Sequence, residues 1–207
     1  MKIDVWSDFL CPYCVLGKKQ LENALNKAGI TGADIEMKSF LLNPGHQEGG
    51  SMRKHLMEKY GYSEAQVQQS FDGLTQAGNQ LGVPLDFEKA IHAGTDRAHA
   101  LLQYAKTQNL GKELNDRLQK AAYTEGQDLG DDAVLVKLAS EVGLDKEASR
   151  IALDSAEYFE KAREEYEDSL RYGARGVPFF VIDNRFAISG AQSEEVFVRT
   201  LNKAAGK

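Results

Sequence analysis

Short stretches of alternating or uniformly apolar residues open the chain. Residues 2–6 (KIDVW) alternate with a period of two, which predicts a strand. From Cys11 the apolar residues recur at helical spacing, and Gly29 is the expected end of this helix. A second strand is expected over residues 35–41 (IEMKSFL), before a turn at residues 43–45 (NPG). This succession predicts a right-handed β-α-β unit.

The C-terminal part of the chain returns to the strand pattern. Residues 178–182 (PFFVI) and 185–189 (RFAIS) flank Asp183-Asn184, a pair typical of a two-residue hairpin turn. Ser193 is then expected to cap a final helix. The end of the chain therefore predicts a β-β-α unit.

Between these two ends the periodicity is almost entirely helical. Ser63 and Gln66 have the spacing of a capping box, and Asp131 opens a further helix. A longer helix is expected to carry apolar residues from Tyr158 to Leu170. Glycines are expected to end the helices of this region at positions 61, 82, 111, 143 and 173.

Together these elements predict an α/β fold. Neither end has enough strands to be stable alone, so the two ends are expected to form one small mixed sheet covered by helices. The predicted boundaries are residues 1–45 and 173–207 for the sheet domain, and residues 46–172 for an all-helical insertion.

Composition narrows the functional classes. The 207 residues carry a net charge of -6, which argues against a general role in binding nucleic acid or a membrane surface. The sequence shows neither a signal-peptide core nor an apolar run long enough to span a membrane. A cytoplasmic protein is therefore expected, either monomeric or homodimeric.

The chain contains two cysteines, Cys11 and Cys14, spaced as C-x-x-C directly after the first strand. Free N–H groups and the dipole at a helix N-terminus favour a thiolate, so Cys11 is expected to have a low pKa and to be the exposed, attacking thiol. Pro12 suits the first helical position, where an N–H group is not needed. Cys14 lies one turn further on, so we expect it to be buried and to resolve a mixed disulfide on Cys11.

Other interpretations of the pair are open. A zinc site needs two more ligands, and the candidates are His46, His55, His92 and His99. None of these has the spacing of a second ligand pair, so no metal is expected. Two buried thiols without a function are the remaining alternative, which the position at a strand-to-helix junction disfavours.

The blocks DFLCPYCVLGK (residues 8–18) and GVPFFVIDNRFAISGAQ (residues 176–192), with the helical region between them, resemble the DsbA-like thioredoxin-fold proteins. The resemblance is greatest to the cytoplasmic, FrnE-like branch, which also contains 2-hydroxychromene-2-carboxylate isomerases and is similar to kappa-class glutathione transferases. It implies a thioredoxin fold with a helical insertion. It also implies that Cys11 attacks, that Cys14 resolves and that the Val177–Pro178 bond is cis.

The resemblance further implies a substrate-binding surface around the thiols. An extended substrate would pair with the backbone of Val177 as an added strand. The segment 189–192 matches the part of the glutathione-using relatives that contacts the γ-glutamyl end of glutathione, although simple capping by Ser193 explains it about as well. The candidate substrate-binding residues are Phe9, Leu10, Pro12, Tyr13, Val177, Pro178, Ser189, Gly190, Ala191 and Gln192.

These observations predict a thiol–disulfide oxidoreductase that acts on protein thiols or on glutathione, with the cysteine pair in place of a cofactor. Cys11 stands where the isomerases and transferases usually carry serine, which favours this chemistry. Two alternatives are a glutathione-dependent isomerase or transferase acting on a small aromatic molecule, and a non-catalytic, chaperone-like binding module. Asp8 is expected to raise the pKa of Cys11, whereas Lys18 and Lys19 are expected to face water.

Overall fold

The computed structural model describes residues 1–46 and 49–207. The chain divides into two compact units, one formed by residues 1–42 and 161–207 and the other by residues 43–160. We describe each unit by itself.

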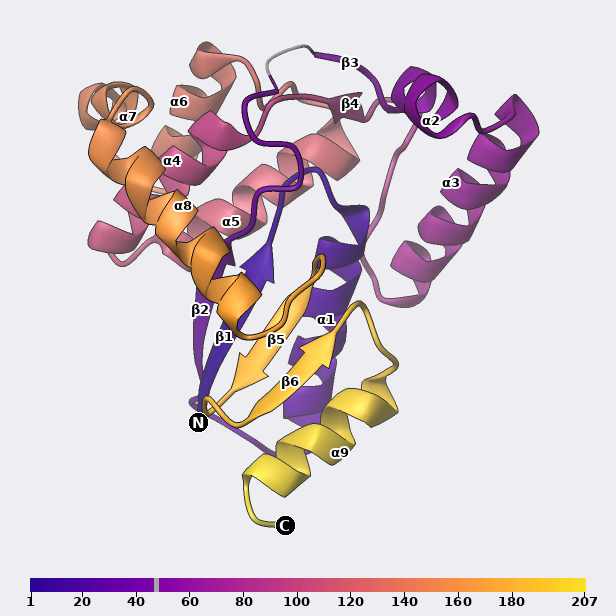
Figure 1. The fold of residues 1–207 in the computed structure, drawn as a ribbon, viewed down its shortest axis with the longest axis vertical. Coiled ribbons are helices and arrows are strands. Elements are labelled where there is room, and N and C mark those ends of the chain that lie inside the picture. The colour runs from indigo at the N-terminus through magenta and orange to yellow at the C-terminus, as the bar shows by residue number, and fades with distance from the viewer. Residues whose placement is uncertain (47–48) are drawn as a thin grey trace. The chain divides into compact units, whose positions relative to one another are not determined.

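The first unit is built on a four-stranded mixed sheet with the strand order β2-β1-β5-β6 (Figure 1). Strands β1 and β2 are parallel, whereas β5 is antiparallel to both β1 and β6. The strands are β1 (Lys2–Ser7), β2 (Asp34–Ser39), β5 (Phe179–Ile182) and β6 (Phe186–Ser189). The helices are α1 (Pro12–Lys27), α9 (Glu194–Ala204) and the part of α8 (Ala156–Arg171) from Lys161 onward. This is the predicted β-α-β and β-β-α arrangement.

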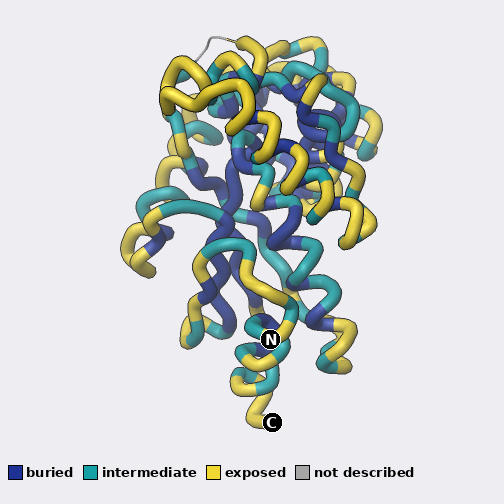
Figure 2. The backbone as a smooth tube through the Cα atoms, turned by 90° about the vertical axis from the view of Figure 1, so that its right-hand side faces the viewer, coloured by how far each residue is buried: buried dark blue, intermediate teal, exposed yellow. Residues whose placement is uncertain are grey.

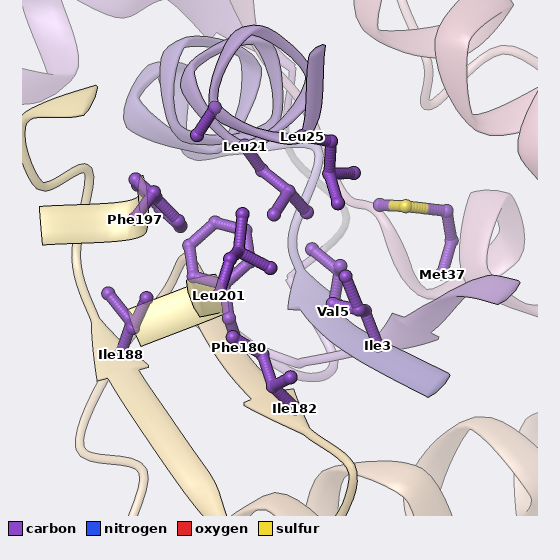
Figure 3. Close-up of a cluster of buried hydrophobic side chains, with 11 residues drawn as sticks. Ile3, Val5, Leu21, Leu25, Met37, Phe180, Ile182, Ile188, Phe197 and Leu201 are labelled. Carbon is purple, nitrogen blue, oxygen red and sulfur yellow. The ribbon is translucent and has the colours of Figure 1, made fainter. Parts of the chain in front are cut away.

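Helices α1 and α9 cover one face of this sheet. Ile3 and Val5 of β1 point to this face, where Phe180 of β5 meets Phe197 of α9 edge to face with ring centroids 4.9 Å apart (Figure 3). Leu21 of α1 is fully buried in the same cluster. This apolar core fixes α1 against the sheet, and its N-terminus therefore has a defined place.

The other face of the sheet packs against the C-terminal part of α8. Trp6 is buried there, and its indole N–H donates a hydrogen bond of 2.7 Å to the backbone carbonyl of Glu165. Phe40 meets Tyr166 edge to face at 5.0 Å. These contacts explain why the first unit includes residues from Lys161 onward, whereas the predicted boundary was residue 173.

The predicted hairpin turn is confirmed. Asp183 and Asn184 have φ angles of 48° and 53°, which is the left-handed conformation that a two-residue turn of type I′ requires. The Asp183 side chain also accepts a hydrogen bond of 2.7 Å from the backbone N–H of Lys2. The turn thus ties the end of β5 to the start of β1.

The second unit is mostly helical, as predicted, but the described part also contains a short antiparallel pair of strands. That pair is β3 (Gly50–Ser51) with β4 (Ile91–His92). The helices here are α2 (Met52–Tyr60), α3 (Glu64–Gln80), α4 (Asp96–Thr107), α5 (Gly111–Lys120), α6 (Asp132–Glu141), α7 (Lys146–Ala152) and the start of α8, with a π-helical turn over Ala121–Glu125.

Most of the predicted helix ends are confirmed in this region and one is wrong. Ser63 and Gln66 form the predicted capping box, and Asp131 caps α6 with its side chain. Gly111, predicted to end a helix, begins α5 instead. The turn before α5 is made by Asn109, which adopts a φ of 57° because asparagine tolerates the left-handed conformation.

Burial is most complete in the two central strands, β1 and β5, whereas the last residues of the chain are exposed (Figure 2). Within the described residues, no helix combines the length and the apolar character needed to cross a membrane.

Candidate active site

The two cysteines lie where β1 passes into α1. A tight turn follows β1, in which the N–H of Cys11 donates a hydrogen bond of 3.0 Å to the carbonyl of Asp8. Cys11 is the N-cap residue of α1, Pro12 occupies its first position and Cys14 lies in its first turn. This confirms the predicted strand-to-helix junction. Both cysteines are free thiols.

Both cysteines are buried, so the prediction that Cys11 is exposed is wrong, whereas the predicted burial of Cys14 is confirmed. Cys11 is 8% exposed and Cys14 is 1% exposed. Cys11 is the more exposed of the two residues, which is the order that the predicted roles require.

The surroundings of Cys11 favour its ionised form and lower its pKa. The largest influence is the hydrogen bond from the Cys14 thiol, and the backbone N–H groups of Cys14 and Tyr13 act in the same direction. Burial and the negative charge of Asp8 oppose them and raise the pKa. The Cys11 side chain makes no capping hydrogen bond to α1.

Cys14 has the opposite behaviour. Burial is the largest cause that raises its pKa well above the ordinary value, and the neighbouring Cys11 raises it further. The Ser7 side chain, also buried, forms a hydrogen bond with Cys14 that lowers the pKa only in part. The surroundings therefore favour the ionised form of Cys11 and the protonated form of Cys14.

The segment before β5 lies against Cys11. The Cys11 thiol donates a hydrogen bond to the backbone carbonyl of Val177, with 3.4 Å between sulfur and oxygen. The Val177–Pro178 peptide bond is cis, which confirms what the family resemblance implied. Val177 is half-buried and Pro178 is buried. The backbone of Val177 is therefore next to the thiol that would carry a bound substrate.

Asp8 holds the loops around the pair together. Its buried carboxylate accepts hydrogen bonds from the N–H of Leu10 at 3.0 Å and from the N–H of Leu42 at 2.7 Å. Because it also raises the pKa of Cys11, the predicted electrostatic effect agrees with the structure. The part played by Leu42 was not predicted, since it follows β2 and has no local signal that relates it to Cys11.

The predicted apolar rim is only partly present. Tyr13 is 51% exposed and Leu10 is half-buried, so both are accessible beside the pair. Phe9 is 3% exposed and belongs to the interior, which corrects its assignment as a contact residue. Leu42, which sequence reasoning missed, is 44% exposed. Pro12 is half-buried at the helix start.

The segment 189–192 uses several of its hydrogen-bond donors internally. The N–H of Gly190 donates to the carbonyl of Pro178 at 2.8 Å, and the N–H of Gln192 donates to the carbonyl of Gly190 at 3.0 Å. The Gln192 amide donates to the carbonyl of Ser189 at 2.8 Å. Ala191 is half-buried. These donors hold the loop beside Pro178, and in this conformation they are not directed at a ligand.

The structure corrects the expectations for Ser193, before α9, and for Lys18, in α1. Ser193 is the N-cap residue of α9, but its side chain forms a hydrogen bond with Glu195 instead of capping the helix. Lys18, expected to face water, is 7% exposed and forms an ion pair with Glu22 at 2.5 Å. Lys19 is half-buried, with 3.9 Å between its amine and Glu22.

The histidines considered as metal ligands lie in the second unit. The rings of His55 and His92 stack with centroids 3.4 Å apart, and His46 approaches His92 at 5.0 Å. His99 is fully buried. Within residues 1–46 and 49–207, no group of three or more histidine, cysteine or acidic residues has an arrangement that could hold a metal ion.

A four-stranded sheet with a C-x-x-C pair at its first helix and a cis-proline beside that pair defines the thioredoxin-fold thiol oxidoreductases. Residues 2–202 match the DSBA-like thioredoxin domain, and the chain belongs to this family. The thioredoxin fold with a helical insertion is thereby confirmed, as is the predicted DsbA-like membership.

Known proteins similar to this chain agree with the family. The uncharacterized protein YwbO of Bacillus subtilis is 31% identical over 204 residues, which cover 97% of this chain and 95% of YwbO. The crystal structure of a probable DsbA oxidoreductase from Streptomyces coelicolor has a TM-score of 0.96 and 33% identity, covering 100% of this chain and 91% of that one. The cytosolic disulfide reductase DsbM of Pseudomonas aeruginosa, solved with GSH, covers 100% of both chains at a TM-score of 0.67 and 19% identity, and so shares the fold.

Proposed function

We propose that this protein is a thiol–disulfide oxidoreductase in which Cys11 attacks and Cys14 resolves. The observation that carries the proposal is the opposite effect of the surroundings on the two thiols. The pKa of Cys11 is lowered chiefly by the Cys14 thiol, while burial raises the pKa of Cys14. A pair of this kind separates an attacking thiolate from a resolving thiol, which stepwise disulfide exchange requires.

The reaction conserves atoms and electrons through one mixed disulfide. The Cys11 thiolate attacks a sulfur of the substrate disulfide, forms the mixed disulfide and releases the other substrate sulfur as a thiolate. Cys14 then attacks the Cys11 sulfur, and its proton leaves with the released thiol. The substrate gains two electrons, and the Cys11–Cys14 disulfide is formed. The reverse sequence oxidises a dithiol.

Two kinds of substrate are compatible with the surface beside Cys11. The exposed Tyr13, the half-buried Leu10 and the backbone of Val177 suit an extended peptide segment. Glutathione is the second, either as a substrate or as the reductant of the Cys11–Cys14 disulfide. Its proposed use is supported by the shared fold of the reductase DsbM, which was solved with GSH. No cofactor besides the cysteine pair is proposed.

The cytoplasm is the proposed location. Its support is the cytosolic reductase DsbM, which has the same fold. We expect the reduction potential to lie between those of thioredoxin and DsbA, roughly -270 to -120 mV, because the described influences on Cys11 partly oppose one another. Equilibration with glutathione buffers measures this value directly.

Trapping in cells tests the proposal. A Cys14→Ala variant is expected to remain disulfide-linked to its substrates through Cys11, and the Cys11→Ala/Cys14→Ala double variant is the matched control. Linked proteins or glutathione on the single variant but not on the double variant support the proposal. Activity that survives in the double variant would indicate a binding module. Turnover of a small aromatic molecule with glutathione, without disulfide exchange, would indicate an isomerase or transferase.

A further inference from the structure

A glycine occupies a buried position in the interior of α1, close to the cysteine pair. Gly17 lies one turn beyond Cys14 and has an ordinary helical backbone, so no left-handed conformation requires glycine there. Glycine in the interior of a helix is destabilising relative to alanine because it loses more backbone freedom on folding. The presence of glycine therefore needs a reason in its contacts.

The contacts supply that reason. A Cβ atom at position 17 would lie 2.8 Å from Cγ of Pro178, 3.2 Å from Cζ of Phe180 and 3.5 Å from Cα of Ala191. Carbon atoms pack best at about 3.5–4.0 Å, so a methyl group would have to displace the Pro178 ring by roughly 0.7 Å or more. Only a residue without a side chain lets this segment rest on α1 as it does.

The segment around Pro178, which a methyl group at position 17 would displace, is held on both sides. The carbonyl of Pro178 accepts the N–H of Gly190 at 2.8 Å, and the next residue, Phe179, pairs with Trp6 in the sheet. On its other side is Val177, whose carbonyl lies 3.4 Å from the Cys11 sulfur. A push on the Pro178 ring is therefore expected to reach the contact between Val177 and Cys11.

We propose that Gly17 is a positioning residue for the attacking thiol, because it lets Pro178 rest on α1 and so sets the contact between the Val177 carbonyl and the Cys11 sulfur. The inference rests on the proposed function of the Cys11–Cys14 pair. The carbonyl accepts the Cys11 proton and disfavours negative charge on the sulfur. When the carbonyl retracts, the thiolate becomes more favourable.

Gly17→Ala tests this inference, and Gly73→Ala is its matched control. Gly73 also lies inside a helix, α3, but a Cβ atom there would meet nothing within 4 Å. Both changes are made in a Cys14→Ser background, which leaves Cys11 as the single thiol. The measurement is the pH dependence of the rate at which Cys11 attacks a small disulfide reagent, which needs no physiological substrate.

In Gly17→Ala the midpoint of the pH profile is expected to move to lower pH. The rate below the midpoint should rise about two- to fourfold, as expected for the loss of one thiol hydrogen bond after allowance for the weaker nucleophile. Gly73→Ala should leave the profile unchanged. A folded Gly17→Ala protein with an unchanged profile would overturn the inference.

A double-mutant cycle keeps the test decisive if Gly17→Ala folds poorly. Pro178→Ala removes the Cγ atom that lies closest to position 17. Gly17→Ala should therefore have a much smaller effect on the profile and on folding in the Pro178→Ala background. Equal effects in both backgrounds, or a double variant that also fails to fold, would refute the role of the Pro178 contact. Failure of the wild-type protein to exchange thiols and disulfides with glutathione or with protein substrates would instead refute the proposed function.

Discussion

Replacing Cys14 with alanine should make Cys11 less reactive at mildly acidic pH than replacing it with serine. The hydrogen bond from the Cys14 thiol is the largest influence that lowers the pKa of Cys11. Alanine removes this donor, whereas serine keeps a hydroxyl donor of similar size at a position that is only 1% exposed. The two variants therefore differ mainly in the donor.

The expected fall in the rate of attack follows from the strength of the lost hydrogen bond and from the change in nucleophilicity of the thiolate. A hydrogen bond to a charged group contributes about 1.5–3 kcal/mol, so its loss lowers the thiolate fraction below the pKa about ten- to a hundred-and-fifty-fold. A more basic thiolate is also a better nucleophile, with a Brønsted slope of about 0.4–0.5. The second effect offsets about half of the first on a logarithmic scale. The rate of attack should therefore fall about four- to twentyfold.

The assay is the initial rate of thiol release from a small disulfide reagent across a range of pH. Each variant has one thiol, so the rate reports Cys11 alone. In denaturant the two variants should react equally, because the donor is no longer held beside the sulfur. Equal rates in the folded proteins would refute the reasoning, and would mean that the helix N–H groups or another group governs Cys11.

Three further predictions concern stability. The free energy of unfolding of the reduced protein should rise with pH between the lowered pKa of folded Cys11 and pH 9.0, because only the folded chain then carries the Cys11 thiolate. Above pH 9.0 it should fall, because Cys14 ionises in the unfolded chain but not in the folded one. The oxidised protein should show neither change. Ser63→Ala should cost about 1 kcal/mol in denaturant unfolding, because the capping box of α3 is lost. Phe180→Ala should cost about 3–5 kcal/mol in the same measurement, since Phe180 is fully buried, and an unchanged midpoint would contradict the described core.

Local patterns predicted the strands but not their order in the sheet. The alternation of β1 is real, since Ile3 and Val5 face one helical layer and Trp6 faces the other. Both faces of the sheet are covered, so polar residues are not confined to an exposed side, and Asp4 is only 5% exposed. The position of β5 beside β1 depends on pairing across most of the chain. The shortage of strands at each end predicted one shared sheet, but periodicity contains no information on which strands are neighbours, and only the family resemblance implied that order.

Glycine does not mark a helix end where a nearby residue adopts the left-handed conformation instead. Asn109 adopts the left-handed conformation that ends the turn after α4, which left Gly111 to begin α5. Gly111 is buried there, and a Cβ atom would lie 2.7 Å from Cγ of Lys106. Asparagine and glycine both suit such a turn, and only tertiary packing decides which one makes it.

The reactive thiol shows the same division between local and distant causes. The position of Cys11 at the helix start and the adverse charge of Asp8 were predictable, since both lie within a few residues. The carbonyl of Val177 is separated from Cys11 by 166 positions, and its contact arises from the packing of β5 against β1. The groups that favour the thiolate thus come from α1 itself, whereas burial, the nearby charge of Asp8 and the contact with the distant Val177 carbonyl oppose it. Changes within α1 should therefore alter how readily Cys11 attacks. Changes near Val177 should alter both the ionisation of Cys11 and the backbone with which a substrate strand would pair.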